Sequence, residues 1–211
     1  LYHDIDDDTL PEWLITTVSL NAGAMPRLAY DDLQQVRFVD FVPFPNPQSV
    51  YGASKWAGEH AVAVHAPGSA IVRTAWVCGA HGHNMVKTVL GLLDRPELAF
   101  VDDQRGCPSF TADLAPMIRR LAADRRVGVH HVTNQGDTTW YGFVRDILEL
   151  AGGDPARVRP IATSELDPPR PAPRPANSVL DNAALRLGGL PLLPHYRDSL
   201  GRLLQDLGAR A

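Results

Sequence analysis

The chain has 211 residues, 45% of them hydrophobic, and carries a formal net charge of −4 at pH 7. A chain of this size can bury a substantial core in one domain or one and a half. Its acidic balance excludes a general nucleic-acid binder, which would show a basic face. No apolar run approaches the ~20 residues of a membrane span, and no signal-peptide pattern opens the sequence.

Cys78 and Cys107 are the only cysteines, and they form no C-x-x-C pair. Two distant thiols are typical of a reducing compartment and argue against a disulfide framework. We therefore expect a cytoplasmic protein without structural disulfides.

Strands and helices are predicted to alternate along the chain, a pattern typical of a parallel sheet covered on both faces. A short strand at 36–39 is followed by a loop at 43–47, and the five prolines within 168–175 predict an extended, irregular segment. The other predicted strands are 70–74, 98–101 and 127–132, and the predicted helices are 49–65, 86–93, 113–123, 140–150 and 196–207. Ser49 is the expected N-cap of the first of these helices.

Tyr51 and Lys55 lie four residues apart within the helix at 49–65, so they share one helix face. A free phenol has a pKa of about 10. A positive charge ~4 Å away contributes about 4 kcal/mol at an effective dielectric of ~20, enough to bring that pKa near neutrality. The spacing therefore indicates an acid–base pair with a lowered tyrosine pKa, although a Tyr and a Lys four apart also occur on ordinary half-exposed helices. Gly52 and Ala53 would allow another group to approach this helix closely.

The stretch Pro47–Lys55, followed by Gly58-Glu59, resembles the active-site helix of extended short-chain dehydrogenases/reductases. The order of the later blocks is similar to the dTDP-4-dehydrorhamnose reductase family, over about residues 36–205. These blocks are Arg73–Gly79, Val101–Pro108, Gly128–Asn134 and Arg174–Asp181.

This resemblance implies an α/β fold with a Rossmann-like doubly wound parallel sheet and a smaller C-terminal α/β substrate-binding region. The dinucleotide-binding core, which is incomplete, would comprise residues 1–76 and 105–135. The substrate-binding region would comprise residues 77–104 and 136–211. The segment 19–26 resembles the helix that follows an Asn-Ala-Ala-Tyr-Thr loop in the family, although that loop itself is absent.

By resemblance, Tyr51 is the general acid that protonates the reduced carbonyl oxygen, and Lys55 lowers its pKa and binds the nicotinamide ribose. The expected cofactor is NADPH, with NADH as an alternative. The expected substrate is a nucleotide-linked 4-keto-6-deoxysugar. The family's third catalytic group, a Ser or Thr hydroxyl, would precede Asp40, where this sequence has none.

Four further residues are candidates for binding the nucleotide-diphospho-sugar. Trp76 would lie near the sugar, or would instead be a core tryptophan. Asn84 would contact the phosphates, or would instead cap a helix. Gln104 belongs to a turn that the family places against the nucleotide. Arg174 could pair with the diphosphate through both guanidinium nitrogens, or could simply be exposed in its proline-rich loop.

We expect no metal site, because the four histidines His81, His83, His130 and His131 lack metal-ligand spacing. No nucleic-acid or membrane partner is expected, and a homodimer is left open as an option. The glycine-rich turn of dinucleotide-binding folds also occurs nowhere in the sequence. Either these residues belong to a longer chain, which we favour, or the cofactor site is genuinely reduced.

Three functions are therefore consistent with the sequence. The first is an NADPH-dependent ketoreductase of a nucleotide-linked 4-keto-6-deoxysugar. The second is a non-catalytic binding or regulatory protein of the same fold, and the third is a related nucleotide-sugar epimerase or dehydratase. Net consumption of NADPH would separate the first from the other two.

Overall fold

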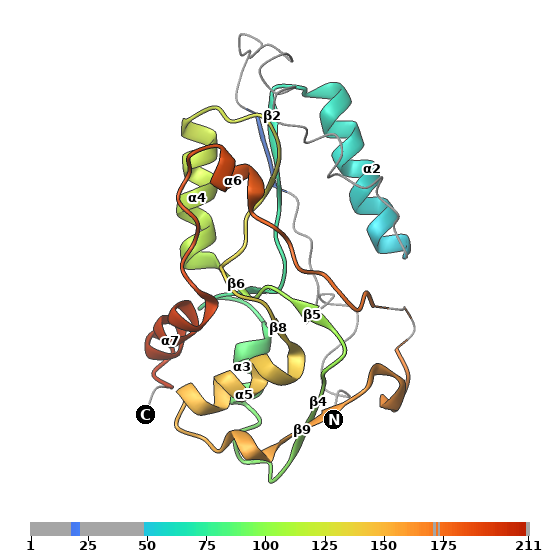
Figure 1. Cartoon of the computed structure of the whole chain (residues 1–211), viewed down its shortest axis with the longest axis vertical. Coiled ribbons are helices and arrows are strands. Elements are labelled where there is room, and N and C mark those ends of the chain that lie inside the picture. Colours follow the sequence, from blue (N-terminus) through green and yellow to red (C-terminus); the bar gives the residue numbers. More distant parts are fainter. Residues whose placement is uncertain (1–17, 22–48, 171, 173, 210–211) are drawn as a thin grey trace.

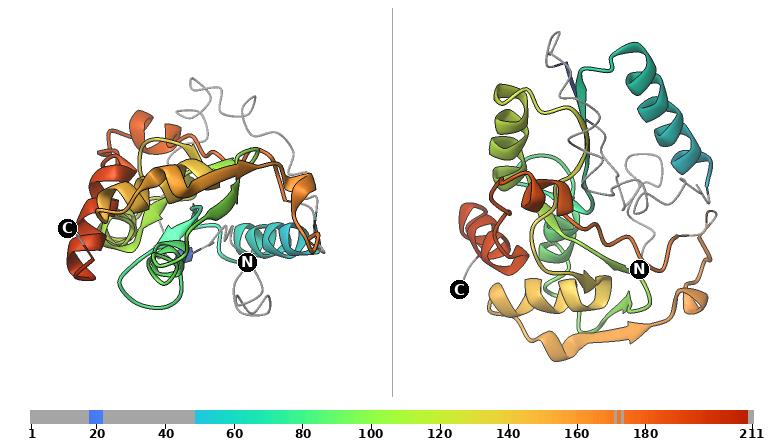
Figure 2. Two further views of the ribbon diagram at one scale, coloured as in Figure 1. Left: turned by 90° about the horizontal axis from the view of Figure 1, so that it is seen from below. Right: turned by 45° about the horizontal axis from the view of Figure 1, so that its top comes forward.

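The computed structural model describes residues 18–21, 49–170, 172 and 174–209. These residues form a small sheet between helices at one end and a cluster of helices and short strands at the other (Figure 1). The helices α2 (Val50–His65) and α7 (Tyr196–Asp206) lie on opposite sides of the molecule in every ribbon view (Figure 1, Figure 2).

The sheet is built around β2 (Ser69–Arg73), which pairs in parallel with β7 (Gly128–His131). Four of the five β2 residues are buried, as expected for a strand covered on both faces. Both strands were predicted from the sequence. On the other edge of β2 lies β1 (Val18–Asn21), which pairs with it antiparallel.

The expectation that the segment 19–26 is helical is therefore wrong for its first residues, Ser19 to Asn21. The open edge of β2 offers unpaired backbone groups, and an extended segment satisfies them from Val18 opposite Val72 to Asn21 opposite Ser69. The strand predicted at 36–39 lies outside the described residues.

Helix α2 begins as predicted at Ser49, whose hydroxyl accepts a hydrogen bond from the Gly52 N–H at 3.1 Å. Its only buried residue is Glu59, which binds the Arg73 guanidinium of β2 through contacts of 2.6 to 3.1 Å. A bidentate pair of this kind fixes orientation as well as distance. The ion pair therefore sets the position of α2, and with it of Tyr51, relative to the sheet.

Helix α4 (Thr111–Ala123) covers the opposite face of the sheet from α2 (Figure 1). The short helix α6 (Ala183–Leu187), which was not predicted, packs beside β7. Together they bury the first core cluster, which contains Val72, Leu114, Met117, Leu121, Val132, Leu185, Leu190 and Leu193.

The second core cluster lies at the other end of the molecule, where α5 (Trp140–Leu150) packs against α3 (Met85–Leu90), β4 (Leu98–Val101) and α7. Helix α5 and strand β4 were predicted with these bounds, whereas α3 ends three residues before its predicted end. The remaining elements of this description are β3 (Val77–Cys78), β5 (Arg105–Gly106), β6 (Ser109–Phe110), β8 (Thr138–Thr139), η2 (Pro155–Arg157), β9 (Val158–Ile161) and η3 (Thr163–Glu165). Strand pairs β3–β6 and β4–β9 are parallel, and β5–β8 is antiparallel.

Within the part of the chain that the structure describes, no helix combines the length and apolar character needed to cross a bilayer.

His130 of β7 predicts a loss of stability in mild acid. Its ring is buried, and Nε2 donates to the Val127 carbonyl at 3.2 Å. Burial lowers the pKa of His130 below its ordinary value near 6.5, and burial likewise lowers that of His131. Because these two histidines are protonated less readily in the folded chain, the unfolded chain binds more protons than the folded chain below about pH 6.5. The free energy of unfolding should fall as pH drops, by at most about 1.4 kcal/mol per pH unit for each histidine.

Urea unfolding between about pH 7 and pH 5 measures this dependence. Replacing His130 by Gln should flatten the slope, whereas replacing the exposed His83 by Gln should leave it unchanged. An equal slope in the wild type and His130→Gln would contradict the assignment.

Candidate active site

Tyr51 stands in the first turn of α2, with its hydroxyl oxygen buried although the residue as a whole is only partly so. Lys55 follows one turn later, and its Nζ lies over the tyrosine ring, 5.3 Å from the ring centroid. The four-residue spacing thus brings the two side chains together as predicted. A buried hydroxyl beside a cation is a suitable group for proton transfer to a bound oxygen.

Burial raises the pKa of Tyr51, and the positive charge of Arg174 partly opposes that rise. The expected direction, a pKa lowered by Lys55, is therefore wrong. The Lys55 ammonium faces the ring, and removing the hydroxyl from water costs the charged form more than the charge of Arg174 returns. At neutral pH Tyr51 is consequently a protonated acid.

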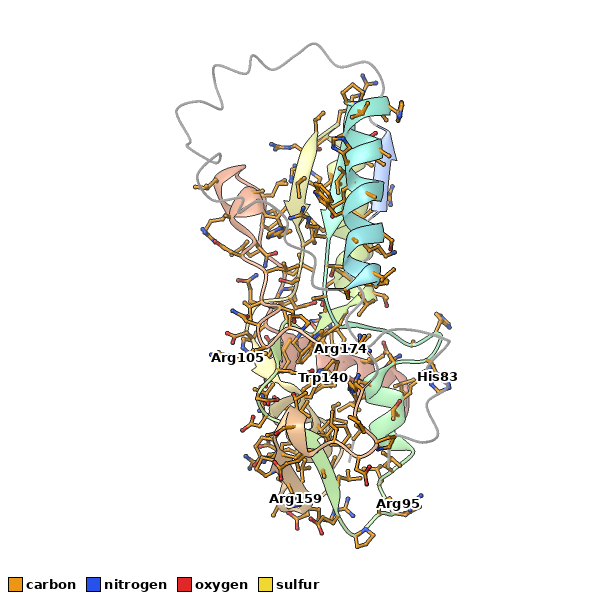
Figure 3. All side chains as sticks on the ribbon, turned by 90° about the vertical axis from the view of Figure 1, so that its right-hand side faces the viewer. His83, Arg95, Arg105, Trp140, Arg159 and Arg174 are labelled. Atoms are coloured by element: carbon orange, nitrogen blue, oxygen red, sulfur yellow. The ribbon has the colours of Figure 1, made fainter. Side chains whose placement is uncertain are left out.

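Arg174 lies in a loop distant in sequence from Tyr51, and its positive charge acts on that residue. Figure 3 places Arg174 below helix α2 in that view. The loop is tied to β5 two residues later, because the Arg105 N–H donates to Ala176 O and the Ser178 N–H donates to Arg105 O, each at 2.9 Å. The sequence suggested Arg174 as a diphosphate ligand, but it gave no sign that the charge of this residue acts on Tyr51.

Trp76 follows β2 and is only 3% exposed. Its ring stacks on Trp140 with centroids 3.7 Å apart and planes 11° apart, and it lies close against Gly106, where a Cβ would come within 2.4 Å of the indole. This position matches the alternative of a core tryptophan. Its φ of +48° is unusual for a residue other than glycine, so the tight packing holds it in a strained backbone conformation.

Asn84 caps helix α3. Its side-chain oxygen accepts from the Lys87 N–H at 3.3 Å, and its amide nitrogen donates to Gly79 O at 2.8 Å. Both ends of the side chain are thus used locally, as the capping alternative requires.

Gln104 is buried and donates to the Thr163 hydroxyl at 2.8 Å. The adjacent Asp103 accepts from the Thr163 N–H and hydroxyl at 2.8 and 2.6 Å. These bonds fasten the turn after β4 to η3. The hydrogen bonds described here join Asn84 to Gly79 and Lys87, and Gln104 to Thr163, and none of them involves Tyr51.

The residues present fit one end of a nicotinamide cofactor. Tyr51 and Lys55 share one face of α2, and Lys55 would hold a nicotinamide ribose there. The glycine-rich turn for the pyrophosphate does not occur in these 211 residues. Among the described residues, no group of three or more His, Cys, Asp or Glu side chains could hold a metal ion.

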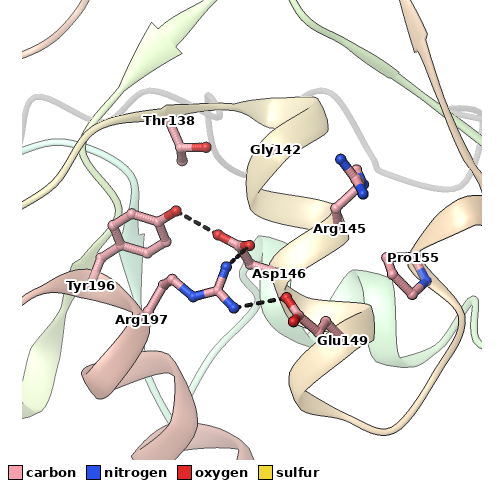
Figure 4. Close-up of a pocket in the computed structure, with 8 residues that line it drawn as sticks. All are labelled: Thr138, Gly142, Arg145, Asp146, Glu149, Pro155, Tyr196 and Arg197. Carbon is pink, nitrogen blue, oxygen red and sulfur yellow. Dashed lines mark hydrogen bonds and ion pairs between the residues drawn. The ribbon is translucent and has the colours of Figure 1, made fainter.

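A cavity of about 300 Å³ lies between α5, η2 and α7 (Figure 4), and the sequence gave no indication of it. Asp146 on its wall accepts hydrogen bonds from the Tyr196 hydroxyl and from Arg197, which also binds Glu149 at 2.7 Å. Burial and the neighbouring Asp146 raise the pKa of Tyr196 to about 12. These charged groups pair with one another, so the network holds α7 against α5 and we assign it no ligand.

The fold is a Rossmann-like α/β fold, and comparison with known proteins identifies its family. The chain belongs to the family described as the RmlD substrate binding domain, whose model matches residues 42–209. This confirms the resemblance to dTDP-4-dehydrorhamnose reductases.

A dTDP-4-dehydrorhamnose reductase of Streptomyces griseus is 43% identical over 172 residues, which cover 78% of this chain and 56% of that protein. The dTDP-4-dehydrorhamnose reductase of Bacillus anthracis, solved in complex with NADP, is 36% identical with a TM-score of 0.74, covering 78% of this chain and 58% of that one. The dTDP-4-dehydrorhamnose reductase of Clostridium acetobutylicum is 35% identical with a TM-score of 0.75, and the match covers 90% of this chain and 62% of that one. The chain therefore spans little more than half the length of these relatives.

Proposed function

We propose that this chain contributes to an NADPH-dependent reduction of the keto group of a dTDP-linked 4-keto-6-deoxysugar. The observation that carries the proposal is the Tyr51–Lys55 pair on α2, with the Tyr51 hydroxyl oxygen buried. Membership of the family and the reductases among its relatives support the same activity.

In this reaction Tyr51 donates its hydroxyl proton to the carbonyl oxygen of the sugar. The raised pKa of Tyr51 keeps that proton in place until the substrate is bound. NADPH supplies the two electrons and the hydrogen that reach the carbonyl carbon. Lys55 would hold the nicotinamide ribose, and a proton from water restores Tyr51 after the product leaves.

The proposal includes the division suggested by the sequence, with residues 1–76 and 105–135 serving the dinucleotide and residues 77–104 and 136–211 serving the sugar nucleotide. Trp76, Asn84, Gln104 and Arg174 remain its candidates for substrate contacts. NADH as a substitute cofactor, a homodimeric state and a cytoplasmic location belong to the same proposal.

The test is the stoichiometry of the reaction with dTDP-4-dehydrorhamnose as substrate. We expect equal loss of NADPH absorbance and of ketosugar, with a product two hydrogens heavier by mass spectrometry. Isomerised or dehydrated sugar without net NADPH loss would identify an epimerase or dehydratase instead. Nucleotide-sugar binding without turnover would favour the non-catalytic alternative, which the missing glycine-rich turn motivates.

A further inference from the structure

We propose that Glu59 and Arg73 are positioning residues for the reduction, because their ion pair fixes the rotation of α2 that presents the Tyr51 hydroxyl to the reacting carbonyl. The proposal rests on the proposed function and deepens it. It assigns to the pair a share of kcat, in addition to its part in holding the fold together.

The first support is the way in which α2 is attached to the sheet. The helix packs against β2 and lies beside that strand in Figure 1. Of the residues described in α2, Glu59 alone is buried, whereas the apolar side chains of Val50, Trp56 and Val64 are 88%, 44% and 58% exposed. A helix ordinarily takes its orientation from a buried apolar stripe. In α2 the buried carboxylate has to supply that orientation.

The second support is the geometry of the ion pair. Arg73 Nε lies 2.9 and 3.1 Å from the two carboxylate oxygens of Glu59, and Arg73 Nη2 lies 2.6 Å from Oε2. The two side chains are only 20% and 9% exposed, so little water competes for these bonds. Arg73 is itself fixed, because it ends β2 opposite His131 of β7 and its carbonyl accepts from the Val132 N–H at 2.8 Å. A planar contact of this kind sets direction as well as distance.

The third support is the spacing along α2. Tyr51, Lys55 and Glu59 follow one another at intervals of four residues, so each lies only about 40° further around the helix axis. Glu59 is therefore on the same side of the helix as the proton donor and about 12 Å along the axis from it. A rotation of roughly 10° moves a group 6 Å from the axis by about 1 Å. A displacement of that size can cost about 10² in rate, so loosening the pair should slow proton transfer.

The test measures whether Glu59 acts through Tyr51. Steady-state kinetics compare Glu59→Gln with its parent in the wild-type and in the Tyr51→Phe chain, at a temperature where circular dichroism shows every variant folded. We expect kcat to fall about tenfold in the wild-type background, with KM for the sugar nucleotide within about twofold, but less than about twofold once Tyr51 is replaced. An unchanged kcat, or the same loss in both backgrounds, would overturn the proposal.

Glu97→Gln is the matched control, because it makes the same change in an ion pair with Arg159, 3.0 Å away, whose side chains are 63% and 56% exposed. It should retain the wild-type kcat. Arg73→Lys keeps a charge opposite Glu59 and replaces Glu59→Gln should that variant fail to fold. A lysine cannot reproduce the planar contact, so we expect kcat about threefold lower, again only while Tyr51 is present.

Amide hydrogen exchange tests the placement of α2 without any substrate. We expect exchange across residues 50–65 to be about tenfold faster in Glu59→Gln than in the wild type, with exchange in α5 unchanged. Unchanged exchange in α2 would overturn the proposal. If exchange in α2 rises while the wild type shows no reduction of ketosugar, the proposed function fails and the attachment of α2 through this ion pair stands.

Discussion

Replacing Tyr51 by Phe should lower kcat for ketosugar reduction by about 10² to 10⁴, the range that a positioned general acid contributes. The change removes only the hydroxyl, and the ring can remain beneath Lys55 Nζ. KM for the sugar nucleotide should change far less, because the lost group acts on the carbonyl oxygen mainly in the transition state. Initial rates at saturating NADPH measure both constants.

Tyr141→Phe is the matched control, because that tyrosine lies on α5 with Arg145 5.5 Å from its ring centroid, away from α2. It should retain the wild-type kcat. Circular dichroism and the thermal midpoint should show that both variants fold. A fully active Tyr51→Phe would remove Tyr51 from the reaction and leave the ketoreductase proposal without its proton donor.

Replacing Phe143 by Ala should lower the free energy of unfolding by about 3 to 5 kcal/mol, the usual cost of truncating a buried phenylalanine. Phe143 is 0% exposed and is surrounded by aromatic rings, with ring-centroid distances of 6.4 Å to Trp76, 6.5 Å to Trp140 and 6.1 Å to Tyr196. The ring therefore joins α5, α7 and the end of β2, and its loss leaves a cavity where they meet.

Thermal and urea unfolding measure this effect, with the midpoint expected to fall by roughly 10 °C. Val129→Ala on β7, where the side chain is 43% exposed, should change the midpoint by no more than a few degrees. If Phe143→Ala and Val129→Ala were equally stable, the second core cluster would not be a principal source of stability.

Elements with strong local signals could be predicted from the sequence. Helix α5 was expected at 140–150 and β4 at 98–101, and both have these bounds. Ser49 was expected to cap α2, and its hydroxyl does accept the Gly52 N–H. Helix α5 has apolar periodicity and Ser49 is a capping side chain, both set within a few residues, whereas β4 has a continuous apolar run although it also pairs with the distant β9.

Elements that depend on distant partners were missed. Strand β9 has only four residues and forms by pairing with β4 about sixty positions earlier. Helix α6 has five residues, and its one buried side chain, Leu185, packs into the cluster beneath β7. Such short segments carry too little periodic pattern to be distinguished from loops, and tertiary contacts decide their conformation.

The candidate site likewise has features that could be predicted from the sequence and features that could not. The Tyr51–Lys55 contact follows from helix geometry and was predicted, whereas the direction of the Tyr51 pKa shift depends on burial, which no local pattern encodes. Arg174 was a candidate for pairing with the diphosphate, whereas the action of its charge on Tyr51 involves a loop that is fastened to β5 by distant hydrogen bonds. Trp76 was weighed both as a substrate contact and as a core residue, and its stacking on Trp140 places it in the core.

Transfer of deuterium from NADPH labelled at the reactive carbon of the nicotinamide tests the central claim most directly. The account predicts that one deuterium appears on the former carbonyl carbon of the sugar, and that its transfer is slowed by about 10² or more in Tyr51→Phe. A reduced sugar without deuterium, or equal transfer in both proteins, would contradict it.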